Sequence, residues 1–228
     1  MALWTIGDPH LSFGCDKPMD VFRGWDGYVS RLETNWRALV DEQDTVVIPG
    51  DVSWGMSLEE AAADFAFLQS LPGRKLLLKG NHDYWWTTRR KMDTFFAEQG
   101  FSSLRIVHND AVDIGDGRAV CGTRGWFYDA ETDADHKVLM REVGRLNASI
   151  DAALALGCEP IVFLHYPPVY ADAVCEELFG VLRDRGIREC YYGHIHSHAI
   201  RRAINGVRDG VRLKLVSADA LSFCPLRV

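Results

Sequence analysis

The chain has 228 residues, of which 47% are hydrophobic and 25% charged, and its formal net charge at pH 7 is -7. This length and composition are typical of one globular domain over residues 1–228, and they exclude disordered and fibrous classes. Because no run of Lys and Arg offsets the negative charge, a long nucleic acid is disfavoured as a partner.

Short apolar runs alternate with stretches of helical periodicity, and this alternation predicts an α/β domain. Helical spacing predicts helices over 25–39, 58–71 and 139–154, the second with a capping box at Ser57 and Glu60. Strand and turn character over 104–122 and after Asn205 predicts a second, more antiparallel sheet. The predicted strands, in chain order, are 3–7, 45–49, 75–79, 104–108, 118–122, 161–164, 189–192 and 211–216.

The chain carries six scattered cysteines without a C-x-x-C pair, which favours reduced thiols in a reducing compartment. The N-terminus lacks the basic and apolar segments of a signal peptide, and no stretch approaches the roughly 20 apolar residues of a membrane span. We therefore expect a cytoplasmic protein without a membrane partner.

Five predicted strands end at or near a residue type that binds borderline-hard metals. In open α/β sheets, groups just beyond the carboxyl ends of strands converge on one crevice. Four of these residues have a glycine beside them, as a sharp turn off a strand requires. The residues are Asp8 and His10, Asp51, Asn81, His165, and His194 with His196.

Seven oxygen and nitrogen donors exceed what one ion uses and leave room for water and substrate, so they indicate two metal ions with one bridging carboxylate. Carboxylates and imidazoles without thiolate favour manganese, iron or zinc, and histidine argues against calcium.

These residues occur in five motifs whose order resembles that of the calcineurin-like metallophosphoesterases. The resemblance runs from residue 7 to residue 196, and its most specific part is Gly80-Asn81-His82-Asp83. The other motifs are Asp8-Pro9-His10, Gly50-Asp51, His165 and Gly193-His194-Ile195-His196.

The resemblance implies a two-sheet β-sandwich flanked by helices, in four α/β/β/α layers. It also implies that Asp8, His10 and His196 hold the first metal, and that Asp51 bridges the two metals. Asn81, His165 and His194 would then hold the second metal.

The implied reaction is phosphoester hydrolysis by a hydroxide that bridges the two metals. By resemblance, His82 is the general acid at the leaving oxygen, and Asp83 orients it. Asn81 and His82 would also contact the substrate. Arg124 could reach a substrate phosphate, although a solvated or ion-paired arginine is an equal alternative.

The expected substrate is a small or medium phosphomonoester or phosphodiester, and the sequence leaves the choice open. A metal-dependent nuclease and a non-catalytic scaffold with this fold are the alternatives. The segments 12–26 and 126–135 are candidates for lining the substrate pocket. For the aromatic run Tyr84-Trp85-Trp86 and for Trp54, core packing is the better prediction and a stacking wall for a base or sugar is the alternative.

Overall fold

A computed structural model describes residues 1–126 and 132–228. The chain divides into two compact units. The first unit comprises Met1–Ile106 and Val216–Val228, and the second comprises Val107–Leu215. The expectation of one domain over residues 1–228 stays a prediction.

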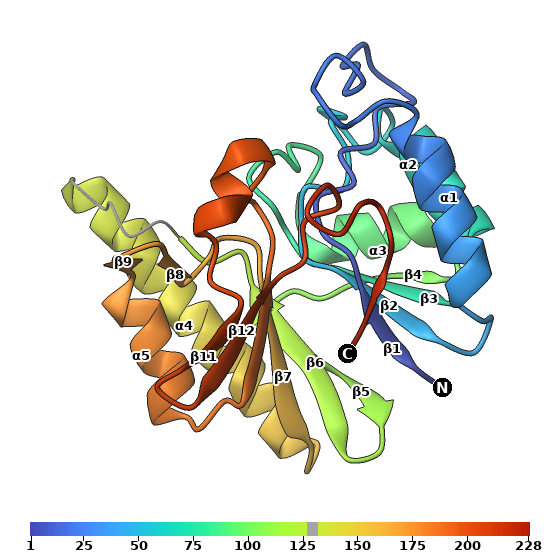
Figure 1. The fold of residues 1–228 in the computed structure, drawn as a ribbon. Coiled ribbons are helices and arrows are strands. Elements are labelled where there is room, and N and C mark those ends of the chain that lie inside the picture. The colour runs from blue at the N-terminus through green and yellow to red at the C-terminus, as the bar shows by residue number, and fades with distance from the viewer. Residues whose placement is uncertain (127–131) are drawn as a thin grey trace. The chain divides into compact units, whose positions relative to one another are not determined.

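The first unit contains a five-stranded sheet in which four strands run parallel (Figure 1). Its strand order is β13-β1-β2-β3-β4, and β13 pairs antiparallel with β1. The strands are β1 (Leu3–Thr5), β2 (Thr45–Ile48), β3 (Arg74–Leu77), β4 (Leu104–Ile106) and β13 (Leu226–Arg227). The helices of this unit are α1 (Tyr28–Leu39), α2 (Ala62–Ser70) and α3 (Arg89–Glu98).

Every residue of β2 is buried, as expected for a parallel strand covered on both faces. On α1, Tyr28, Leu32 and Trp36 recur four residues apart and bury one face of the helix. The Trp36 indole also donates a hydrogen bond to the carbonyl oxygen of Pro72 at 3.0 Å. Aromatic and aliphatic packing therefore holds the first sheet and its helices together.

The second unit contains a six-stranded sheet, in the order β11-β12-β10-β7-β6-β5. The four inner strands run parallel, and the edge strands β5 and β11 pair antiparallel with their neighbours. These strands are β5 (Ala111–Gly115), β6 (Arg118–Thr123), β7 (Glu159–Leu164), β10 (Glu189–Tyr192), β11 (Gly206–Arg208) and β12 (Val211–Leu215). The unit also contains α4 (Asp133–Ala155), α5 (Glu176–Asp184), the 3-10 helix η1 (Ser197–Arg202) and a small pair, β8 (Val169–Tyr170) and β9 (Ala173–Val174).

Hairpin turns make the two edges of this sheet antiparallel. Asp209 and Gly210 join β11 to β12, and both have positive φ, at 46° and 83°. Two-residue hairpins of this kind require φ above zero at both positions. The prediction of a more antiparallel second sheet is therefore wrong for its centre, where helical crossovers produce parallel strands. It is also wrong for 104–108, because β4 pairs with β3 in the first sheet.

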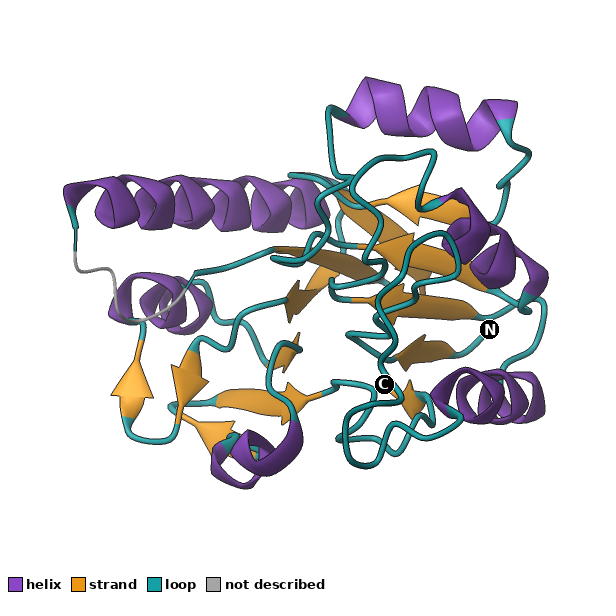
Figure 2. Cartoon of the chain, turned by 90° about the horizontal axis from the view of Figure 1, so that it is seen from above, coloured by secondary structure: helices purple, strands orange, loops and turns teal. Residues whose placement is uncertain are grey.

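Helices, drawn in purple in Figure 2, cover the orange strands of the second unit. The long helix α4 begins at a capping box formed by Thr132 and Asp135, and it packs on β5, β6 and β7. α5 packs against α4. The predicted α/β class with two large sheets flanked by helices is confirmed.

Three differences from the predicted elements have local causes. The Ser57 hydroxyl accepts a hydrogen bond from the Glu60 N–H at 3.2 Å, as the capping box requires, but the next residues form a turn and α2 begins at Ala62. α3 was not predicted, because it opens on Arg89-Arg90-Lys91, which places cations at the positive end of the helix dipole. α5 was also not predicted, because this helix has only nine residues and its apolar periodicity is correspondingly short.

All six cysteines lie within the described residues, and each is a free thiol. Within residues 1–126 and 132–228, every helix is too short or too polar to cross a membrane. The cytoplasmic location stays a prediction.

Lys75 on β3 is fully buried, and its ammonium donates to the carbonyl oxygens of Leu71 and Gly73 at 2.6 and 2.7 Å. Burial lowers the pKa of Lys75 from 10.5 to about 8. Between these two pH values the unfolded chain holds a proton that the folded chain has released, so the unfolding free energy rises with pH in this window.

We therefore expect the unfolding free energy of the wild type, minus that of Lys75→Met, to increase by about 3 kcal/mol across this window. Urea unfolding at a series of pH values measures the difference, in which the titration of other groups cancels. A difference that stays flat with pH would contradict the assignment.

Candidate metal centre

The segment after β1 runs alongside the segment after β2 and stays hydrogen-bonded to it beyond the strand ends. The N–H of Asp8 donates to the Gly50 carbonyl, and the N–H of His10 donates to the Asp51 carbonyl, both at 3.0 Å. Pro9, which has no N–H, occupies the position between these two donors. Main-chain pairing thus fixes the two segments from which three of the predicted ligands project.

Three of these ligands have a left-handed backbone, with φ of 54° at Asp8, 46° at His10 and 51° at Asp51. Residues with a side chain rarely adopt this conformation, and each instance costs on the order of 1–3 kcal/mol. Such strain persists where the surrounding structure over-determines it, and it is concentrated at functional sites. The backbone geometry therefore points to the same residues as the sequence motifs.

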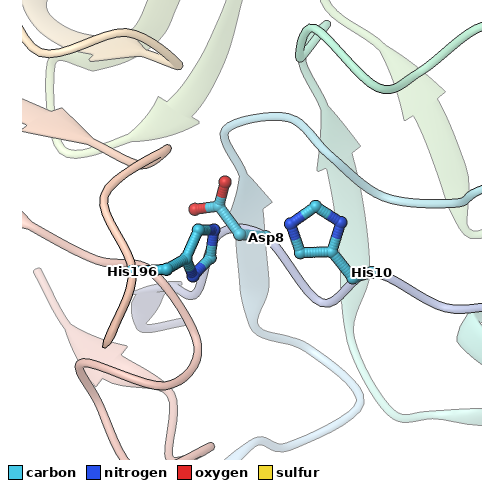
Figure 3. Close-up of side chains that lie close together, drawn as sticks. All are labelled: Asp8, His10 and His196. Carbon is cyan, nitrogen blue, oxygen red and sulfur yellow. The ribbon is translucent and has the colours of Figure 1, made fainter. Parts of the chain in front are cut away.

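The same three side chains are almost completely buried, with exposed fractions of 0% for Asp8, 4% for His10 and 1% for Asp51. Figure 3 labels Asp8 and His10 on the segment after β1, together with His196, which follows β10. The His10 Nε2 atom lies 3.7 Å from the Asp51 Oδ2 atom. Buried carboxylates are costly unless a cation or hydrogen bonds compensate their charge.

The carboxylate of Asp83 holds the segments after β2 and β3 together. It accepts main-chain hydrogen bonds from Asp51 at 2.9 Å, Val52 at 2.8 Å and Gly80 at 2.7 Å. It also accepts one from the Trp85 indole at 2.9 Å. These bonds give Asp83 a positioning role toward the backbone, and its orientation of the His82 ring stays a prediction.

Gly80 lies against Asp51 at a distance that excludes any side chain. A Cβ atom at this position would come within 2.1 Å of the Asp51 Oδ1 atom. The same oxygen accepts a hydrogen bond from the His82 N–H at 2.8 Å. Asn81 and His82, both half-buried, are therefore held next to the predicted bridging carboxylate.

The second unit carries the remaining predicted ligands on the segments after β7 and β10. The N–H of Gly193 donates to the His165 carbonyl at 3.1 Å, and His194 has a left-handed backbone with φ of 72°. The His194 Nδ1 and His165 Nε2 atoms lie 3.2 Å apart, with their rings inclined at 73°. His165 is fully buried, and His196 is half-buried ahead of η1.

This arrangement fits metal binding on chemical grounds. Metal–imidazole bonds of about 2.0–2.1 Å place two nitrogens of one ion roughly 3 Å apart, as the His165 and His194 nitrogens are. Buried carboxylates beside imidazoles form a donor set that suits manganese, iron or zinc.

Arg124 stands at the end of β6, and its carbonyl oxygen accepts hydrogen bonds from the His165 and Tyr166 N–H groups. Its guanidinium lies 3.6 Å from the buried Glu142 carboxylate and 4.8 Å from the Trp126 ring centroid. The structure therefore contains the ion-paired arginine that the sequence left as the alternative. A contact of Arg124 with substrate phosphate stays a prediction.

Sequence reasoning missed Asp64, which lies on the buried face of α2. Its carboxylate accepts hydrogen bonds from the Ser53 hydroxyl and from the Phe13 N–H, and so it connects the segments after β1 and β2. Burial raises the pKa of the Asp64 carboxyl. A signal was present, because Asp64 falls three residues after Ala61 and four before Leu68 on the apolar face.

Of the two segments predicted to line a substrate pocket, one is fully described. Ser12, Phe13 and Met19 from the 12–26 segment line a cavity of about 270 Å³ together with Tyr28. The 126–135 segment lies partly outside the described residues, because 127–131 are not described.

The sequence model of calcineurin-like phosphoesterases matches residues 1–198. The chain belongs to the calcineurin-like phosphoesterase family. Its two ligand-bearing segments in the second unit and three in the first all fall within the matched range. Membership assigns the chain to the phosphoesterase-type hydrolases, which use divalent metals.

Solved structures support the fold of this phosphoesterase. A protein of unknown function from Aquifex aeolicus has a TM-score of 0.55 at 14% identity, covering 99% of this chain and 95% of its own. A phosphopantetheinyl hydrolase from Mycobacterium tuberculosis also has a TM-score of 0.55, at 16% identity, covering 100% of this chain and 95% of its own. None of the curated proteins matches this phosphoesterase.

We expect Asp83→Asn to destabilise the metal-free phosphoesterase by about 2–3 kcal/mol. The substitution replaces one carboxylate oxygen, which accepts hydrogen bonds from main-chain N–H groups, by an NH₂ group that can only donate. Urea unfolding measures the change. Asp93→Asn is the matched control, since Asp93 is exposed and pairs only at the surface with Arg89, where a loss stays within about 1 kcal/mol. Equal destabilisation by the two substitutions would refute the positioning role of Asp83.

Proposed function

We propose that the chain is a dinuclear-metal phosphomonoesterase or phosphodiesterase that acts on a small or medium phosphoester. The observation that carries the proposal is the left-handed backbone at Asp8, His10, Asp51 and His194, four predicted ligands in family motifs. Strain at so many motif positions is costly unless the positions serve a site.

The proposed ligand assignment follows the donor chemistry and the order of the motifs. Asp8, His10 and His196 hold one ion, Asn81, His165 and His194 hold the other, and Asp51 is shared. Asp8, His10 and His196 form one candidate metal-binding group, and Asp51, His165 and His194 form another. Within the first unit the Asp51 carboxylate lies 3.7 Å from His10, a proposed ligand of the first ion, which supports its role as the shared carboxylate.

Two bound divalent ions polarise a phosphoester and lower the pKa of water toward neutrality. The residues of the chain supply the rest of the chemistry. His82 donates a proton to the leaving oxygen. The hydrogen bond from its main-chain N–H to the Asp51 carboxylate places it beside this proposed ligand. Asn81 and His82 contact the substrate, and Arg124 supplies a guanidinium for a phosphate oxygen.

The first test is hydrolysis of mono- and bis-nitrophenyl phosphate by metal-stripped protein after manganese, iron or zinc is added back. We expect activity to return with at least one metal and to require two ions per chain by elemental analysis. Asp51→Asn is expected to lose the metal pair and the activity, because both ions share this carboxylate.

Metal binding without hydrolysis of either ester would instead support the non-catalytic scaffold. Cleavage of single-stranded DNA at a higher kcat/KM than either nitrophenyl ester would support the nuclease.

The second test concerns His82. We expect His82→Ala to keep its metal content and to slow hydrolysis of alkyl phosphates by about 10²-fold or more, because these poor leaving groups need a proton. Hydrolysis of nitrophenyl esters is expected to slow much less, because nitrophenolate leaves as a stable anion without a proton. The exposed His136→Ala serves as the matched control. A loss of equal size for both kinds of ester would eliminate the general-acid role.

A further inference from the structure

Aromatic side chains flank His82, the residue that donates a proton to the leaving group in the proposed function. The Trp54 ring centroid lies 4.4 Å from that of His82 at 44°, and the Tyr84 centroid lies 6.0 Å away at 72°. The Tyr84 hydroxyl is also 3.4 Å from the His82 Nδ1 atom. Any group that accepts a proton from His82 therefore leaves between or beside aromatic rings.

Trp54 is held rigidly at this position. Its N–H donates to the Leu11 carbonyl at 2.9 Å, and its indole N–H donates to the Met19 sulfur at 3.3 Å. Its ring stacks on His10 at 5.0 Å and 21°. The side chain stays only half-buried despite these contacts. A ring ordered in advance binds a planar ligand at a lower entropic cost than a mobile one.

Tyr84 differs from the two tryptophans that follow it. Trp85 is 2% exposed and packs edge to face on Phe65, and Trp86 packs against Trp85. Tyr84 is 52% exposed. Core packing accounts for the tryptophans, as the sequence predicted, but it does not account for an exposed aromatic ring beside His82.

Lys17 adds a positive charge to the same group. Its ammonium lies 5.6 Å from the Trp54 ring centroid, and the side chain is exposed. Although the chain has a formal net charge of -7, this lysine places a positive charge beside the aromatic ring, where it can attract an anionic substituent of the ligand.

We propose that Trp54, Tyr84 and Lys17 form a leaving-group subsite that selects phosphoesters whose leaving group carries a planar aromatic ring, such as a nucleoside. The inference rests on the proposed function and deepens it, since it names the substrate class. Trp54 supplies the stacking surface, Tyr84 bounds it beside His82, and Lys17 attracts further negative charge on the ligand.

The test compares adenosine 5′-monophosphate with ribose 5-phosphate, which share the phosphate and the ribose and differ in that adenine replaces the anomeric hydroxyl. Their inhibition constants are measured against hydrolysis of whichever nitrophenyl ester the metal-loaded enzyme cleaves. We expect the nucleotide to inhibit at a concentration about tenfold lower, as stacking of one base predicts. Trp54→Leu should remove most of this preference and change inhibition by ribose 5-phosphate less than twofold.

Two further variants separate recognition from structural damage. Tyr84→Ala should reduce the preference in the same sense, because this exposed side chain supports no core. Met56→Ala removes another exposed apolar side chain, two positions from Trp54, and should leave the preference unchanged. Elemental analysis checks that Trp54→Leu, which loses the stack on His10, still binds its metals.

Equal inhibition by the two phosphates in the wild type would overturn the subsite, as would an equal change for both in Trp54→Leu with intact metal content. If neither nitrophenyl ester is hydrolysed with any metal, the proposed function fails. Calorimetric binding of the same two phosphates to the metal-loaded chain then tests the subsite on its own, with the same tenfold preference expected.

Discussion

The buried carboxylate of Asp83 ties together two segments of the first unit that carry predicted ligands. An anion removed from water is tolerated only where hydrogen bonds replace its hydration, and Asp83 obtains these from the main chain after β2, the main chain after β3 and the Trp85 indole. Separating the two segments would break these main-chain hydrogen bonds to the carboxylate. The backbone of Asp51 and the approach of Gly80 to it follow from that requirement.

Main-chain hydrogen bonds between neighbouring segments constrain the left-handed residues. Asp8, His10 and Asp51 would relax toward ordinary conformations if their segments were free, but pairing of the β1 and β2 segments fixes the N–H groups of Asp8 and His10. In the second unit His194 also has a left-handed backbone, and the N–H of its neighbour Gly193 donates a hydrogen bond to the segment after β7. Strain and hydrogen bonding together aim acidic and imidazole side chains away from the strands that carry them.

Trp54 connects this framework to substrate selection. One ring packs on the imidazole of a predicted ligand, His10, and on that of the proposed acid, His82. Trp54, Tyr84 and Lys17 all lie on loops, outside the helices and strands of the first unit. Loops of this kind are where related enzymes on one fold acquire different substrates.

The sequence by itself determined the fold class, the family and the residue types of the candidate metal centre, because short apolar runs, helical periodicity and short motifs are local properties. Strand ends at Asp8, Asp51 and His165 could be located in this way. Only the tertiary structure decided the role of Asp83, the anchoring by Asp64, and the contrast between the exposed Tyr84 and the buried Trp85. These depend on which groups lose water and which partners they meet, and such partners come from segments distant in the chain.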